Sequence, residues 1–217
     1  MRLLFAALAL LLTAAPSFAQ TPDRYAQFKV LGLAPSARAT ALQGSVGAVY
    51  GDAPVAYFYN PALLNPQMDR QVAVSYLNHL ADISAGSALY VRDVDRLQGT
   101  LAASIRYLSY GEFERADENG VRDGSTFGAG DVALSVSYAR ALTADERLRG
   151  GAMVHALFAT LDDAGASALA FDAGVAYTIP EQRLTVSAAV VNAGAVFSSF
   201  GEEDDTLPFD VRLAVAK

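Results

Sequence analysis

The sequence predicts an all-β protein, an antiparallel barrel that crosses a membrane with its strands. Hydrophobic residues make up 53% of the chain, yet beyond residue 20 no apolar run approaches the ~18 residues that a membrane helix needs. From Gln71 onward, apolar residues recur at every second position. The positions between them hold mainly Ala, Ser, Gly and Thr rather than Lys and Glu. This alternation is typical of a barrel whose outer face contacts lipid.

The first residues have the pattern of a secretory signal peptide. Arg2 precedes an apolar run over 3–12, and the small-residue cleavage site 17–19 follows. The run is too short to span a bilayer, so we expect residues 1–19 to be removed after export through the Sec pathway. The chain has no Cys, which excludes disulfides, thiol catalysis and Cys-based metal sites. Its net charge of -7, without clustered Lys or Arg, argues against nucleic acid as a partner.

Residues 20–70 are predicted to form a plug rather than barrel wall. The stretch 25–66 is irregular and rich in Pro, Ala and Gly. Ser36 is placed to cap a short helix over 37–42. Asn60 and Pro61 provide the N-cap and the first position of a second helix over 61–64. The pair at 65–66, Asn followed by Pro, is expected to end that helix.

Residues 71–217 are predicted to supply the barrel strands. In the clearest segment, 131–140, Val132, Leu134 and Val136 take one face while Ser135 and Ser137 take the other. Strands of ~9–11 residues match a tilted crossing of the bilayer. Tyrosines near the ends of several candidates predict interfacial aromatic girdles. The eight candidate strands are 71–78, 84–91, 100–107, 131–140, 147–158, 169–177, 184–192 and 209–215.

The connections between candidate strands differ in length. Those at 93–96, 143–146 and 180–182 are short and polar, as expected for periplasmic turns. The stretches 111–128 and 198–207 are predicted to be longer extracellular loops that contact partners. Their candidate partner residues are Glu112, Asp117, Asn119, Asp123, Glu202, Glu203, Asp204 and Asp205.

Eight strands do not leave room for the plug. An eight-stranded barrel has an interior only wide enough for its own side chains. The chain also ends within the apolar alternation of 209–215, without a terminal aromatic residue. We therefore expect this sequence to supply about eight strands of a wider barrel, with several strands missing.

The plug region resembles a known family. Residues 33–42 form an Ala-rich segment containing Arg38, and Gly44 follows shortly after it. The later segment 52–64 includes the motif Asn-Pro-Ala-Leu. Both are similar to the plug of the PorV/PorQ proteins, which belong to the FadL-like class of outer-membrane barrels. This resemblance implies a barrel of about 14 strands when complete. Gln43 departs from the family, which usually has a second Gly there.

The middle of the chain is similar to the PorQ-like members of this family, through residues 110–113, 117, 120, 124, 127, 129–133, 192–194 and 207–209. The resemblance implies an outer-membrane component of the type IX secretion system. It implies an anchor for PorZ beside PorU and PorV, surrounded by outer-membrane lipid and lipopolysaccharide. It also implies a non-enzymatic protein with no cofactor, metal or catalytic residue.

Three local patterns suggest other chemistry and are interpreted as structural. His79 and His155 are far apart in sequence, so we expect them to be separate polar residues rather than a shared metal or catalytic site. Residues 128–133 imitate a dinucleotide fingerprint but precede a strand instead of opening a helix. The acidic stretch 117–124 does not have the ligand spacing of a helix–loop–helix calcium site. No Ser–His–Asp order, nucleophile elbow or phosphate loop is evident in the sequence.

Two alternatives remain open at the level of sequence. A FadL-like barrel could transport hydrophobic compounds, with the plug as a gate. An exported, soluble β-domain would instead bury the alternating apolar residues in a compact core.

Overall fold

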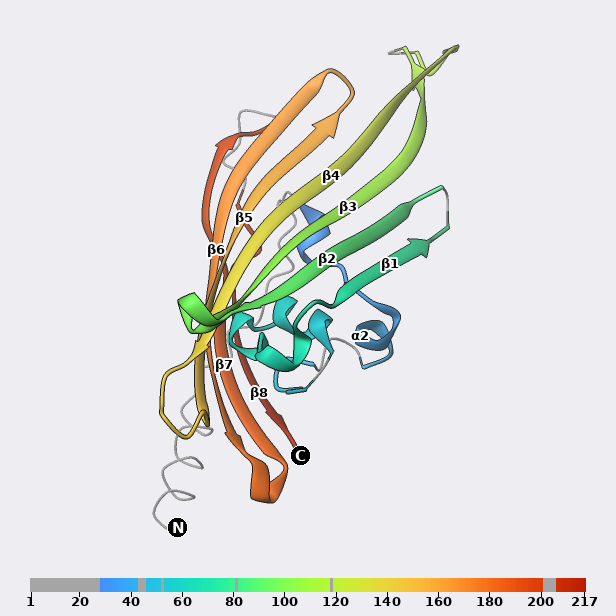
Figure 1. The fold of residues 1–217 in the computed structure, drawn as a ribbon. Helices are drawn as coiled ribbons and strands as arrows, with labels where there is room; N and C mark the ends of the chain where they lie inside the picture. The colour runs from blue at the N-terminus through green and yellow to red at the C-terminus, as the bar shows by residue number, and fades with distance from the viewer. Residues whose placement is uncertain (1–27, 43–45, 52, 81, 118, 201–205) are drawn as a thin grey trace, which may run out of the picture.

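The computed structural model describes residues 28–42, 46–51, 53–80, 82–117, 119–200 and 206–217. The predicted signal peptide, the plug residue Gly44 and the partner residues Glu202 to Asp205 lie outside these ranges. Within them the chain forms one sheet and a group of short helices (Figure 1). None of these helices is long and apolar enough to cross a membrane.

The sheet has eight strands in sequence order, and every neighbouring pair is antiparallel. This confirms the all-β class and the eight predicted strands. In the described part of the chain, β1 and β8 each pair with one neighbour, so the sheet is open. Its strands are β1 Val72–Asn78, β2 Ser84–Val94, β3 Gly99–Ala116, β4 Arg122–Ala141, β5 Leu148–Leu161, β6 Ala164–Ile179, β7 Leu184–Ser198 and β8 Asp210–Ala216.

The alternation along each strand separates two faces of opposite character. On β4, Leu134 and Val136 are 45% and 59% exposed, whereas Ser135 and Ser137 are buried. The bulky apolar side chains thus point away from the rest of the protein, and the small or polar side chains point towards it. The same exposed face carries Val72, Val74, Tyr76, Tyr90, Ile105, Tyr107, Val154, Phe158, Phe171, Val175, Tyr177, Val186, Val190, Val211, Leu213 and Val215.

The N-terminal segment packs on the inner face of the sheet (Figure 1). Its elements are η1 Lys29–Leu31, α2 Ala37–Ala41, η2 Pro54–Phe58, η3 Pro61–Leu63 and η4 Pro66–Met68. Here η denotes a 3₁₀-helix. The first lies against β3 and β4, η3 lies against β4, β5 and β6, and η4 lies against β2.

The predicted helix starts are present, and the second helix differs in type. The Ser36 side chain accepts a hydrogen bond from the Ala39 N–H, which caps α2 as expected. Asn60 caps η3 through the Ala62 N–H. We expected an ordinary helix ending at residue 64, but η3 is a single 3₁₀ turn because Leu64 is already extended. Asn65 then caps a further 3₁₀ turn, η4.

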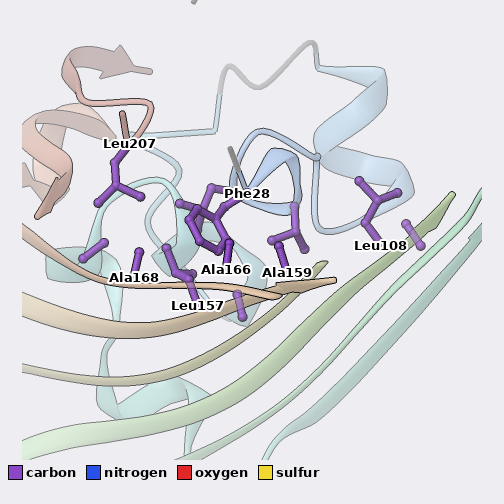
Figure 2. Close-up of a cluster of buried hydrophobic side chains, with 12 residues drawn as sticks. Phe28, Leu108, Leu157, Ala159, Ala166, Ala168 and Leu207 are labelled. Atoms are coloured by element: carbon purple, nitrogen blue, oxygen red, sulfur yellow. The ribbon is translucent and has the colours of Figure 1, made fainter. Parts of the chain in front are cut away.

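Two apolar clusters join the N-terminal segment to the sheet. We call the described residues of 28–70 the plug, after the role predicted for them, and the sheet the wall. The first contains Phe28, Val30 and Leu31 of the plug with small and apolar residues of β2 to β6. Figure 2 shows Phe28 beside Leu157 and Ala166 in this cluster. The second contains Tyr57, Phe58, Leu64 and Met68 with inner-face residues of β2 to β5. The core therefore forms between plug and sheet rather than within the sheet.

The prediction of a loop over 111–128 is wrong. β3 continues to Ala116 and β4 begins at Arg122, so most of the expected loop is strand. The pairing of β3 with β4 continues into this extension past a β-bulge between Ser109 and Glu112. Phe113 pairs with Phe127 across it, with ring centroids 5.4 Å apart. This aromatic cross-strand pair stabilises pairing where the polar sequence suggested a loop.

Candidate functional site: the plugged inner face

The plug is hydrogen-bonded to the strands on which it lies. The Asn60 amide nitrogen donates to the Val175 carbonyl at 3.2 Å and to the Ala188 carbonyl at 3.3 Å. Because Asn60 is 1% exposed and its oxygen caps η3, its whole amide is used inside the protein. One plug residue therefore binds the backbones of β6 and β7 together.

Two glycines allow this close approach. A Cβ on Gly174 of β6 would lie 2.1 Å from the Asn60 Oδ1. A Cβ on Gly151 of β5 would lie 2.5 Å from the Pro61 backbone. No side chain fits at such distances, so the wall has glycine where η3 contacts it. The Asn60-Pro61 motif and these two glycines form one contact.

Further bonds fix the plug to other strands. The Val30 N–H donates to the Asp131 Oδ2 of β4 at 3.2 Å, and the Tyr110 hydroxyl donates to the same oxygen. The Ser87 hydroxyl of β2 donates to the Pro35 carbonyl at 3.0 Å. Arg149 of β5 donates to the Leu64 carbonyl at 3.0 Å. With Asn60, these contacts connect the plug to β2, β4, β5, β6 and β7.

A row of polar side chains crosses the inner face between the two apolar clusters. We call it the polar belt. On β5, for example, His155 lies between Met153 of the second cluster and Leu157 of the first. Strand pairing places Ser87 opposite Arg106 and Ser135 opposite His155. The steps from Arg106 to Ser135 and from His155 to Asp172 are diagonal across adjacent strands. The polar belt consists of Ser87, Arg106, Ser135, His155, Asp172 and Asn192.

Four members of the polar belt form a hydrogen-bonded chain. The Ser135 hydroxyl lies 2.7 Å from His155 Nδ1, and His155 Nε2 lies 3.0 Å from Asp172 Oδ2. The Asn192 N–H donates to Asp172 Oδ1 at 2.7 Å. The four side chains are between 1% and 6% exposed. Each buried polar group thus finds a partner within the network, as buried polar groups require.

The order serine, histidine, aspartate is also that of a hydrolase triad, and sequence analysis missed it. These residues are distant in sequence and meet only through the pairing of β4, β5 and β6. Ser135 is 4% exposed, and the hydrogen bonds of His155 join side chains of β4, β5 and β6.

The other sequence patterns are located apart from this network. His79 is exposed at the end of β1, so the structure does not bring it to His155. Residues 128–133 open no helix, but they lie inside β4 rather than in the turn that we expected before a strand. Arg38 is exposed on α2. Within the described ranges, no three His, Asp or Glu side chains are grouped so as to hold a metal ion.

Four of the eight predicted partner residues belong to the β3–β4 hairpin. Glu112 is on β3, Asp117 and Asn119 are in the turn, and Asp123 is on β4. Pairing with β2 ends at Ser109 and pairing with β5 begins at Ala129. The segment 110–128 therefore extends beyond the flanking strands (Figure 1). We call it the projecting hairpin.

Local interactions order the projecting hairpin. The Val121 and Asn119 N–H groups donate to Asp117 Oδ1 at 2.8 and 2.9 Å. These bonds, that from Val121 first, hold the pKa of the Asp117 carboxyl below its usual value. Arg122 pairs with Glu114, and Arg115 pairs with Asp162 in the β5–β6 turn. The acidic residues thus lie on a formed ribbon.

Comparisons with known proteins do not assign a family. No protein-family model matches the chain, and no curated protein is significantly similar to it.

Proposed function

We propose that this chain is the plugged wall of an outer-membrane β-barrel. The single observation that carries the proposal is the distribution of side chains, which is the inverse of that in a water-soluble protein. Large apolar residues such as Val136 and Leu213, 59% and 79% exposed, cover the outer face, while Ser, His, Asp and Arg are buried inside. In water such a face would lose the stabilisation that burial gives. In a bilayer it is the face that contacts lipid.

Within this class, we propose the role that the resemblance implies, a non-enzymatic anchor of the type IX secretion attachment complex. Two features support an anchoring role. The plug is bonded to five strands, which suits a rigid platform. The projecting hairpin offers an ordered acidic ribbon beyond the wall. Partners such as PorZ would contact this ribbon, and PorU and PorV would lie beside the barrel.

Replacing residues 111–128 by a two-residue turn in the full-length protein tests the anchoring role. The hydrogen bonds between the plug and the sheet lie outside this segment, whose contacts to the β5–β6 turn at Asp162 are peripheral, so the protein should reach the outer membrane at the wild-type level. We expect surface-retained PorZ to fall severalfold, measured by surface labelling of intact cells. A matched control carries Arg147→Gln, which alters an exposed turn at the other end of the strands. Unchanged PorZ retention in the shortened variant would count against this surface.

The alternative is a FadL-like transporter of hydrophobic compounds. A plug that acts as a gate must leave the wall, and here it would break bonds to β2, β4, β5, β6 and β7. The bonded plug therefore favours the anchor over the transporter. Uptake of a long-chain fatty acid into proteoliposomes containing the full-length protein, above that of empty liposomes, would reverse this preference.

A further inference from the structure

The projecting hairpin leaves one edge of β3 open. Pairing of β3 with β2 ends at Ser109, whereas its pairing with β4 continues to Ala116. Residues 112–116 therefore have β4 on one side and no strand on the other (Figure 1). Within the described ranges, their backbone forms no hydrogen bond to the backbone of any segment other than β4. Four of the five side chains are exposed. We call residues 112–116 the open edge.

The β4 side of the hairpin is partly covered. The Gly128 carbonyl accepts a hydrogen bond from the Asp162 N–H of the β5–β6 turn at 3.0 Å. Arg115 also pairs with Asp162, so its side chain lies across β4. Gly124 of β4 has a φ of 81°, which departs from the extended geometry that strand pairing needs. The open edge is therefore the side of the hairpin on which a further strand fits.

The side chains of the open edge determine which strand it accepts. Glu112 and Glu114 lie on one face of β3, and Phe113 lies on the other because side chains alternate along a strand. Glu114 pairs with Arg122, while Glu112 forms no ion pair within the described ranges. Phe113 is 43% exposed and offers an apolar surface. Like charges directly opposite destabilise a sheet, so this edge disfavours a second copy of itself and favours a basic strand.

We propose that the open edge binds an extended segment of a partner protein in which basic and apolar residues alternate. The segment joins the hairpin as a further strand, held by main-chain hydrogen bonds. Its basic side chains lie beside Glu112 and Glu114, and an apolar side chain lies beside Phe113. The inference rests on the proposed function, in which the hairpin lies outside the membrane. It adds the chemistry of the partner segment and the way in which that segment is bound.

Amide hydrogen exchange of the purified full-length protein, held in a non-ionic detergent, tests the proposal. The probe is a capped heptapeptide of alternating lysine and valine. We expect saturable binding and new protection at alternate residues of the open edge. The N–H groups of a strand point alternately to its two sides, so those already bonded to β4 gain no protection. A contact made by side chains alone would not give this alternating pattern.

Two further peptides and two protein variants isolate the determinants. Replacing the central valine by proline keeps the charge but breaks an extended, hydrogen-bonded strand, so the alternating protection should disappear. Replacing every lysine by glutamate should abolish binding. In the protein, Glu112→Lys should weaken binding by about two- to fivefold, the effect of an exposed charge pair. Glu146→Lys makes the same change in the turn between β4 and β5, at the other end of β4, and should bind like the wild type.

The outcomes separate strand addition from the anchoring role. Absence of binding, equal affinity of the proline or glutamate peptide, or equal affinity of Glu112→Lys and the wild type overturns the proposal. Protection without the alternating pattern does so too. If the peptide protects the open edge but the protein with the shortened hairpin still retains PorZ, only the anchoring role fails. If PorZ retention requires the hairpin but the peptide leaves the open edge unprotected, only strand addition fails.

Discussion

Single residues decide how closely the plug approaches the wall. Gly174 is the sharpest case, because a Cβ there would lie 2.1 Å from Asn60 Oδ1 and within 3.1 Å of the Ala188 carbonyl. The same Asn60 amide binds β6 and β7. A methyl group at 174 would therefore displace the residue that joins η3 to two strands.

We expect Gly174→Ala to lower the free energy of unfolding by about 1–3 kcal/mol, the usual cost of overpacking. Gly165→Ala on the same strand is the matched control, since its Cβ would have its nearest contact at 4.0 Å. That variant should change stability by less than about 1 kcal/mol. Denaturant unfolding in detergent micelles measures both, and equal losses would show that the Asn60 contact is dispensable.

Substitutions at single exposed residues can also show whether the outer face contacts lipid or water. Leu134 on β4 and Leu142 just beyond its end are similarly exposed, 45% and 52%. Arg at a lipid-facing midplane position costs about 2–4 kcal/mol, and near the interface about 0–1 kcal/mol. We expect Leu134→Arg to lower the free energy of unfolding from liposomes by the larger of these amounts. Leu142→Arg should lower it by the smaller amount. Two equally mild effects would favour the water-soluble alternative.

At the scale of elements, the β3–β4 turn depends on one carboxylate. Asp117 accepts the Val121 and Asn119 N–H groups, and its folded pKa lies below the ordinary 3.8. A group with a lowered folded pKa contributes stability above its unfolded pKa, and this contribution is lost as pH falls through the folded value. The turn should therefore loosen only below about pH 4.

Amide hydrogen exchange at Val121 measures this loosening directly. We expect protection, corrected for the intrinsic rate, to decrease as pH falls below 4 in the wild-type protein. Asp117→Asn keeps an acceptor oxygen for the same N–H groups but does not titrate. Its protection should stay constant over that range. A parallel decrease in both proteins would attribute the loosening to another group.

The element boundaries show where sequence patterns succeed. Alternation over 131–140 located the C-terminal half of β4 correctly, because its outward and inward positions carry different kinds of side chain. It missed the extension over 110–128, where polar residues and glycines suggested a loop. The ladder persists there because Phe113 and Phe127 stack across the hairpin, a pairing that depends on the bulge after Ser109.

At the scale of the whole molecule, the plug and the sheet form one core. Phe28, Tyr57 and Met68 are buried in clusters whose inward sheet residues are mostly Ala, with a few Leu, Val and Met. Neither part has enough apolar surface to pack alone on that side, since the sheet directs its large residues outward. Plug and wall therefore stabilise each other, which agrees with an anchor that keeps one shape.

Sequence alone determined the class of fold, because period-two alternation and the absence of long apolar runs are local properties. It also indicated the caps at Ser36 and Asn60, which depend on adjacent residues. Only the tertiary structure decided that Asn60 meets Gly174, that Ser135, His155 and Asp172 form a chain, and that Arg106 is buried over the ring of Phe58. These contacts join residues far apart in sequence, and strand register and plug docking, rather than local pattern, set their positions.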